Sequence, residues 1–288
     1  MSSLAPTTVR KFSQDQEPED RPDLLAVEEP LEIRLGYGPV GERMQRSLSV
    51  TMRTPGHDEE LALGYLFNEQ IIRTPDQVVS VRHCVSDADK KGNVLRVELQ
   101  PDRPVDWTML ERNGYTSSSC GLCGKTSIEA VQASGLEPLS AAFSINSERI
   151  HGLPEKLRQA QRAFAYTGGL HAAALFDGEG RIVLVREDIG RHNALDKLIG
   201  AAFWQGRTPL ASFGVLVSGR VGFELVQKCW TAGVPLLAAV GAPSSLAVEM
   251  ATEAGMTLLG FVRDNRFNCY SMPDRLLEVG KRYEENWS

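Results

Sequence analysis

The feature that most constrains the fold is a regular alternation of strand and helix patterns through the second half of the chain. Short apolar runs such as FGVLVSG and PLLAAVG are typical of buried strands, and helical patterns such as FELVQKCWTAG stand between them. Strands that alternate with helices predict a largely buried sheet with helices on its faces. We therefore expect residues 151–288 to form a three-layer α/β domain, and we assign the chain to the α/β class.

The preceding part of the chain predicts a smaller unit. Four short alternating patterns are typical of strands: EEPLEIRL, SLSVTMR, VVSVRHCV and NVLRVEL. Between the second and the third, EELALGYLFNEQII has helical periodicity, with Asp58 as its candidate N-cap. Residues 26–115 are therefore expected to form a small α+β subdomain. Residues 1–25 are rich in Pro, Ser and acidic residues and predict a disordered tail.

Apolar patterning and charge argue against a membrane or nucleic-acid partner. No stretch approaches the ~18 apolar residues of a transmembrane helix, and no apolar run follows the basic residues of the N-terminus, as a signal peptide would require. The net charge of -6 disfavours nucleic acid, because an acidic surface repels phosphate. We expect a cytoplasmic protein.

The strongest candidate for chemistry is the pair Cys120 and Cys123, in SSSCGLCGKTS. With five cysteines and no export signal, we expect free, metal-bound or catalytic thiols in place of disulfides. A zinc site would need two further ligands at suitable spacing, and a thioredoxin-like dithiol would follow a hydrophobic strand. The flanking serines and glycines and Lys125 favour a third interpretation, an exposed thiolate that carries sulfur as a persulfide. Residues 116–150 would then be a mobile loop and connection.

Three glycine-containing turns join a strand to a helix in the second half of the chain: EDIGRHNALDKL, VSGRVGFELVQK and VGAPSSLAVEMA. Free N–H groups at a helix start bind anions, and Arg191 or Arg220 could close onto a phosphate. Ligands of open α/β sheets bind at the edge where such turns gather. The turns therefore predict a site for a large phosphorylated or nucleotide-containing ligand. The alternative is that the two arginines only pair with Asp188 or Glu224.

Two histidines and one strand pattern are further candidates for contacts with a ligand. His171 follows two glycines in TGGLHAAALFD, and His192 is next to Arg191. Each could contact a ring or a phosphate, although a lone histidine is more often a core or cap residue. In RFNCY, alternate residues share one strand face, which would suit a planar ring or an ordinary edge strand. The sequence has no Walker glycine loop and no His-x-x-x-His metal pair.

Six stretches carry a resemblance to a known family: SCGLCGK, TGGLHAAAL, REDIGRHNALDKLIG, VSGRVGFELVQK, VGAPSSLAVEMA and GFVRDNRFNCYS. Together they resemble the FdhD family of formate dehydrogenase accessory sulfurtransferases. That family takes sulfur from a cysteine desulfurase onto a Cys-x-x-Cys cysteine. It delivers this sulfur to bis-molybdopterin guanine dinucleotide before the cofactor enters formate dehydrogenase. The resemblance implies a persulfide on Cys120, a homodimer, and a larger domain similar to the cytidine deaminase fold without its zinc chemistry.

We therefore expect a sulfurtransferase that acts as a persulfide carrier, with Cys120 and Cys123 as catalytic residues and no metal site. Its expected partners are a cysteine desulfurase, the catalytic subunit of formate dehydrogenase and the molybdenum cofactor, with GDP as a fragment ligand. The turns, the histidines and the resemblance together give the expected cofactor contacts: Phe261, Val262, Arg263, Asp264, Asn265, Arg266, His171, Arg191, His192, Ser218, Gly219 and Arg220.

Two alternatives stay open. The first is a non-catalytic chaperone that binds the molybdenum cofactor and transfers nothing. The second is a zinc-dependent, deaminase-like nucleotide enzyme, which would need a glutamate as proton shuttle. The second residue after His171 is Ala173, which counts against the deaminase.

Overall fold

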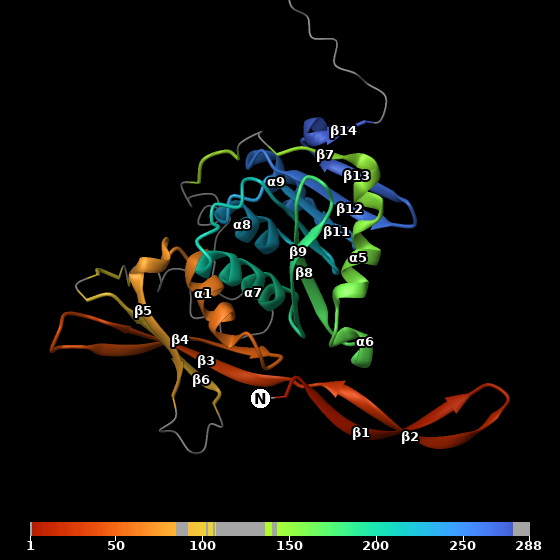
Figure 1. The fold of residues 1–288 in the computed structure, drawn as a ribbon, viewed down its shortest axis with the longest axis horizontal. Coiled ribbons are helices and arrows are strands. Elements are labelled where there is room, and N and C mark those ends of the chain that lie inside the picture. The colour runs from red at the N-terminus through yellow and green to blue at the C-terminus, as the bar shows by residue number, and fades with distance from the viewer. Residues whose placement is uncertain are drawn as a thin grey trace, which may run out of the picture. The chain divides into compact units, whose positions relative to one another are not determined.

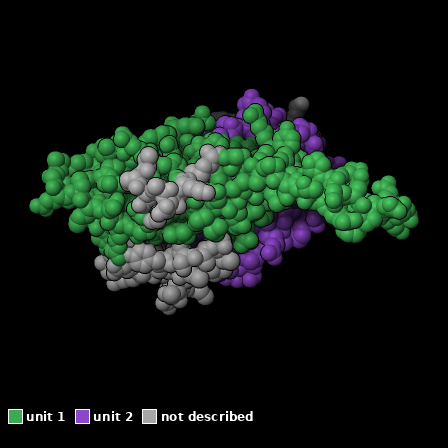
Figure 2. Space-filling model, turned by 90° about the horizontal axis from the view of Figure 1, so that it is seen from below, with its two compact units in different colours: residues 1–135, 160–173, 185–208 green, residues 136–159, 174–184, 209–288 purple. Residues whose placement is uncertain are grey.

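The computed structural model describes residues 2–84, 92–101, 103–105, 107, 136–139 and 143–278. The chain divides into two compact units, which Figure 2 shows in different colours. Unit 1 comprises residues 1–135, 160–173 and 185–208, and unit 2 comprises residues 136–159, 174–184 and 209–288. Both units are discontinuous, so they differ from the predicted division between residues 150 and 151.

Unit 1 contains a four-stranded sheet with the order β4-β3-β6-β5 (Figure 1). Strand β3 is antiparallel to β4 and parallel to β6, and β5 is antiparallel to β6. The strands are those that the alternating patterns predict. Their bounds are β3 Glu29–Tyr37, β4 Met44–Arg53, β5 Val78–His83 and β6 Val94–Leu99.

The helices α1 (Asp58–Asn68) and α7 (Arg191–Trp204) pack against each other within unit 1. Their backbones meet at two glycines, because a Cβ on Gly64 would lie 1.9 Å from the Asp196 carbonyl oxygen. A Cβ on Gly200 would lie 1.8 Å from the Glu60 carbonyl oxygen. This packing explains the discontinuous unit, since it brings a helix from the second half of the sequence against one from the first.

Residues 4–26 form a β-hairpin where the sequence predicts a disordered tail. Strands β1 (Leu4–Ser13) and β2 (Gln16–Ala26) pair in antiparallel register, with Arg10 opposite Asp20 and Lys11 opposite Glu19. Directly opposed charges of opposite sign stabilise such a pair. The same charged residues that suggest disorder in the linear sequence are therefore arranged as cross-strand partners.

The second half of the chain supplies a six-stranded sheet with the order β13-β12-β11-β10-β8-β9. Strands β10, β11 and β12 are parallel, and β13 returns antiparallel to β12. The bounds are β8 His171–Phe176, β9 Ile182–Asp188, β10 Gly214–Val217, β11 Leu236–Ala239, β12 Thr257–Arg263 and β13 Arg266–Ser271. The central strands are buried along their whole length, as continuous apolar runs predict.

The remaining elements connect and cover these strands. Helices α8 and α9 contact each other, and Figure 1 shows them on one side of β10–β12 with α5 on the other. The bounds are β7 Ile145–Asn146, α4 Ser147–His151, α5 Leu153–Ala160, α6 Phe164–Thr167, α8 Phe223–Thr231, α9 Ser245–Glu253 and β14 Leu276–Leu277, with short 3-10 turns η1 Pro75–Gln77 and η2 Pro273–Arg275.

The mixed α/β class is confirmed by this arrangement. The similarity to the cytidine deaminase fold stays a prediction. No helix among the described residues combines the length and the apolar character that crossing a bilayer requires.

Candidate functional site

The carboxyl ends of β10, β11 and β12 form a closely packed edge in unit 2. The turn after β10 and the turn after β11 are joined by backbone hydrogen bonds, from Gly241 N to Gly219 O at 3.1 Å and from Val221 N to Ala242 O at 3.1 Å. A Cβ on Gly241 would lie 2.9 Å from Arg220 N, so only glycine allows this approach. The edge therefore presents two adjacent backbone turns, as predicted for a ligand site of an α/β sheet.

The stretch Phe261–Arg266 lies at the end of β12 and at its hairpin with β13. Asp264 and Asn265 have φ angles of 53° and 54°, which indicate a two-residue hairpin turn with both central residues left-handed. Phe261 also has a positive φ of 54°, at a register shift between Gly260 and Arg263. Its backbone N–H donates to Gly241 O at 3.0 Å, which ties the bulge to the turn after β11.

The structure thus brings part of the predicted cofactor set together in unit 2. Ser218, Gly219 and Arg220 lie on the turn beside Gly241, and Phe261 is bonded to the same glycine. The side chains from Arg263 to Arg266 are exposed at the hairpin tip, and Val262 is fully buried. Val262 therefore has no accessible side chain for a ligand.

The alternative interpretation of the two arginines, ion pairs with Asp188 or Glu224, does not describe their contacts. Within the described part of the chain, neither Arg191 nor Arg220 forms an ion pair. The Asp188 carboxylate instead binds Lys197 Nζ at 2.7 Å. Arg220 is exposed at its turn, where its guanidinium can meet an anion, whereas Arg191 is half-buried.

In unit 1, Asp188 holds the turn that precedes α7. Its carboxylate accepts hydrogen bonds from Gly190 N at 2.8 Å, Asn193 Nδ2 at 3.1 Å and Thr54 N at 3.1 Å. The Lys197 ammonium also donates to Thr54 O at 2.8 Å. The start of α7 is thereby fixed to the end of β4, because one buried carboxylate serves both segments.

His171, Arg191 and His192 lie around the start of α7. Burial lowers the pKa of His171, the positive charge of Arg191 lowers it further, and Asp188 opposes the shift. His171 is thus kept neutral to a lower pH than an exposed histidine. The buried Arg191 Nε has no partner among the described atoms. A neutral imidazole beside an unpaired guanidinium can hold a polar anionic group.

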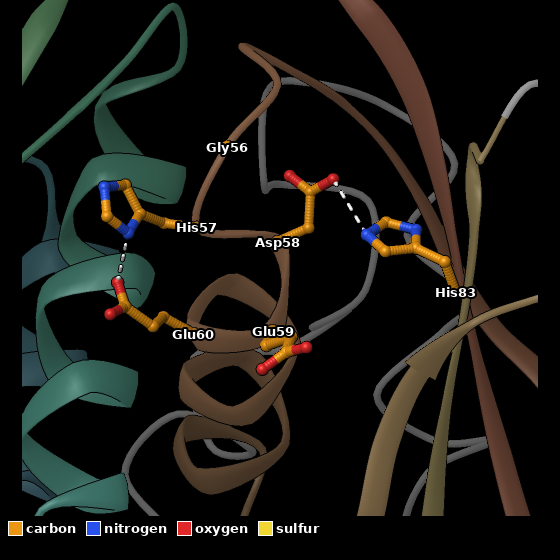
Figure 3. Close-up of a pocket in the computed structure, with 6 residues that line it drawn as sticks. All are labelled: Gly56, His57, Asp58, Glu59, Glu60 and His83. Atoms are coloured by element: carbon orange, nitrogen blue, oxygen red, sulfur yellow. Dashed lines mark ion pairs between the residues drawn. The ribbon is translucent and has the colours of Figure 1, made fainter. Parts of the chain in front are cut away.

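Sequence analysis did not identify a cavity at the start of α1, which Figure 3 shows in close-up. The cavity has a volume of about 340 Å³ and is lined by Gly56, His57, Asp58, Glu59, Glu60 and His83. Asp58 is the first helical residue and not the N-cap, which is His57 with a left-handed φ of 58°. The run GHDEE, one histidine next to three acids, is the only sequence signal that marks it.

Two imidazole–carboxylate pairs face this cavity. His57 Nδ1 lies 3.2 Å from Glu60 Oε2, and His83 Nε2 lies 3.6 Å from Asp58 Oδ2. Each carboxylate is also held by an arginine, Glu60 by Arg186 and Asp58 by Arg53. The two arginines balance Asp58 and Glu60, so Glu59 is the acid of the cavity lining that neither of them holds.

Cys120 and Cys123 lie outside the described residues, as does most of the predicted loop over residues 116–150. Among the described residues, no three His, Cys, Asp or Glu side chains are grouped so that they could hold a metal ion.

The profile of the FdhD/NarQ family matches residues 26–277 of the chain. The chain therefore belongs to the FdhD/NarQ family, in agreement with the six motifs. The relatives called "Sulfur carrier protein FdhD" include one from Mycolicibacterium paratuberculosis, 48% identical over 260 residues that cover 89% of this chain and 93% of the relative. Another, from Mycobacterium tuberculosis, is 47% identical and covers 93% of this chain and 96% of the relative.

The fold also matches a solved structure. A candidate formate dehydrogenase accessory protein from Desulfotalea psychrophila superposes with a TM-score of 0.74 and 21% sequence identity, covering 96% of this chain and all of that one. At this identity the match concerns the fold alone.

Proposed function

We propose that this chain is a cytoplasmic sulfur carrier that serves formate dehydrogenase. The chain receives sulfur from a cysteine desulfurase and delivers it to bis-molybdopterin guanine dinucleotide, which is its cargo. The similarity to relatives named as sulfur carriers supports the first half of this proposal. The second half, the binding of this cargo, depends on one structural observation. At the sheet edge, two glycine turns are joined by hydrogen bonds, and Arg220 on one of them is unpaired.

The proposed transfer is an exchange of one sulfur–sulfur bond for another. The Cys120 thiolate attacks the terminal sulfur of the desulfurase persulfide. A bond forms between the Cys120 sulfur and that terminal sulfur, and the desulfurase cysteine leaves as a thiolate. The exchange needs no external oxidant or reductant. Cys123 then either releases the sulfur by forming a disulfide with Cys120 or assists the relay.

The cargo would be held by its polar arms. The Arg220 guanidinium, on the turn after β10, suits the phosphates, whereas the backbone N–H groups of Val221 and Gly241 already donate within the edge. The hairpin residues Phe261 and Arg263 to Arg266 and the cluster of His171, Arg191 and His192 offer further contacts. The chain is proposed to work as a homodimer, with the desulfurase and the catalytic subunit of formate dehydrogenase as partners.

The sulfur step is tested by intact mass after incubation with a cysteine desulfurase and cysteine. We expect the wild type to gain one sulfur atom and Cys120→Ala to gain none. Cys84→Ala is the matched control, since Cys84 is a free and half-buried cysteine that should not affect loading. A sulfur atom still gained by Cys120→Ala would rule out the persulfide assignment. A wild type that binds GDP but gains no sulfur would favour the non-catalytic chaperone.

A further inference from the structure

A second cavity in unit 1 is lined by the residues that follow β4, by β9 and by the residues that precede α6. Its volume is about 430 Å³, within the range of roughly 300–1,000 Å³ that small-molecule sites occupy. All of its lining residues belong to unit 1. The lining combines charged side chains with apolar ones, among them Pro55, Leu170 and Val185. Such a cavity suits a small molecule that has both charged and apolar parts.

Three basic side chains of this lining already have partners within the protein. Lys197 Nζ lies 2.7 Å from Asp188 Oδ2. The Glu60 carboxylate accepts a hydrogen bond from Arg186, and its Oε2 lies 3.2 Å from His57 Nδ1. These basic groups are therefore met by carboxylates of the protein before any ligand binds.

The other two charged side chains of the lining, Arg162 and Glu187, do not pair with each other. The Arg162 side chain is exposed, and within the described part of the chain it forms neither an ion pair nor a hydrogen bond. Glu187 is half-buried, and its two carboxylate oxygens accept backbone N–H groups, from Ala163 at 3.0 Å and from Phe164 at 2.8 Å. Because a carboxylate oxygen can accept more than one hydrogen bond, both oxygens can still receive a donor. Two opposite charges therefore line one cavity and are both available to a ligand.

These two charges define the chemistry of the ligand. An anion alone would be repelled by Glu187, and a cation alone would be repelled by Arg162. A molecule with one negative and one positive group satisfies both side chains. A carboxylate matches the planar guanidinium with two parallel hydrogen bonds and brings one charge, whereas a phosphate monoester brings nearly two. An ammonium group brings N–H donors, which are what a carboxylate accepts.

We propose that this cavity binds a small zwitterion of the α-amino acid type, with its carboxylate on Arg162 and its ammonium group on Glu187. The side chain of the ligand lies against the apolar wall formed by Pro55, Leu170 and Val185. Free amino acids and short peptides share this chemistry and differ in the distance between their two charges. None of these five residues is among those proposed for sulfur transfer or for the cargo, so this site does not depend on the proposed function.

The test is calorimetry on the full chain with two zwitterions, L-leucine and leucyl-leucine, and with the amide and the N-acetyl derivative of each. The amide lacks the carboxylate, and the N-acetyl derivative lacks the ammonium group. We expect each derivative to bind roughly ten- to a hundredfold more weakly than its parent zwitterion, because one charge-assisted contact is lost.

Arg162→Gln tests the residue that we assign to the carboxylate. Zwitterion affinity should fall by roughly ten- to a hundredfold, and amide affinity should change little, because the amide has no charge for the guanidinium to bind. Arg158→Gln is the matched control, since Arg158 is exposed on α5, does not line the cavity and should leave all affinities unchanged. Both arginines are exposed, so both variants should keep the wild-type melting temperature.

The two zwitterions distinguish the sources of the ligand. Tighter binding of leucine assigns the cavity to free amino acids, tighter binding of leucyl-leucine assigns it to short peptides, and either result supports the proposal. If Arg162→Gln melts like the wild type and binds the zwitterion equally well, the proposal is overturned. It is also overturned if the derivatives bind as tightly as their parents, or if neither zwitterion binds the wild type at millimolar concentration.

Discussion

At the residue scale, breaking the buried ion pair between Asp188 and Lys197 should strongly destabilise the fold. Their side chains are 0% and 1% exposed, and the two charged groups are 2.7 Å apart. Lys197→Met leaves a buried carboxylate without its cation, so we expect a loss of about 3–5 kcal/mol in the free energy of unfolding. Urea denaturation at neutral pH measures it.

The matched control is an exposed ion pair of the same length. Arg181 Nε lies 2.7 Å from Asp177 Oδ2, with the arginine side chain 74% exposed. Arg181→Met should cost no more than about 1 kcal/mol. Equal losses in Arg181→Met and Lys197→Met would contradict the role of burial.

The Glu60 carboxylate should make the stability of the protein depend on pH. Burial raises its pKa, but hydrogen bonds from Arg186 and His57 and their charges outweigh burial and lower it from 4.5 to about 2. The ionised carboxylate therefore stabilises the fold above pH 4.5, and this contribution is lost as the pH falls towards 2. Glu60→Gln should be less stable by about 1–3 kcal/mol at pH 7, since its hydrogen bonds are charge-assisted.

The measurement is urea denaturation of Glu60→Gln and wild type from pH 7 to pH 3. The stability difference between them should shrink once the pH falls below 4.5. Glu59→Gln, an exposed neighbour, should match the wild type at every pH. A difference for Glu60→Gln that is constant with pH would show that ionisation of Glu60 does not contribute.

The sequence could not predict which charged side chains of the site pair with each other. Arg191 is close in sequence to Asp188, yet Asp188 takes its charge partner from Lys197 and a hydrogen bond from Thr54, which is 134 positions away in the sequence. Pairing depends on distances in space that no local pattern contains. The motif residues themselves could be identified, because their types and spacing are local.

At the element scale, the crossing of α1 and α7 depends on two glycines. In Gly64→Ala or Gly200→Ala, the new methyl group would lie within 1.9 Å of a backbone carbonyl oxygen, so the helices must separate. We expect each substitution to cost about 1–3 kcal/mol or more, as overpacking does. Thermal unfolding measures it. Gly152→Ala is the control, because the atoms nearest to a Cβ on Gly152 are 3.9 Å away. A similar loss of stability in Gly152→Ala would show that the loss does not come from the close contact of α1 with α7.

Helices and strands of the main sheets agree with the sequence patterns, whereas the N-terminal hairpin does not. The apolar periods of β10, β11 and α8 are local and are visible in the sequence. Strand β2 is exposed along most of its length, so it has no buried face and no alternation to detect. Its pairing with β1 depends on charges that become neighbours only when the strands are opposite.

At the scale of the whole molecule, sulfur carrying and cargo binding should be separable. Cys120 is proposed to carry the sulfur, and Arg220 is proposed to hold a phosphate. Cys120→Ala should lose sulfur loading and keep GDP affinity. Arg220→Ala should keep sulfur loading and bind GDP roughly ten- to a hundredfold more weakly, since a charge-assisted hydrogen bond contributes about 1.5–3 kcal/mol.

When both assays are run on Cys120→Ala and on Arg220→Ala, each variant is the control for the other. Intact mass reports the sulfur, and calorimetry at two salt concentrations reports the nucleotide. Because the phosphate contacts are electrostatic, wild-type GDP binding should weaken at the higher salt, and Arg220→Ala should show a smaller dependence. If Arg220→Ala also fails to accept sulfur from the desulfurase, the arginine belongs to the sulfur step and not to the cargo alone. If Cys120→Ala loses GDP binding as well, the two activities cannot be assigned to separate residues.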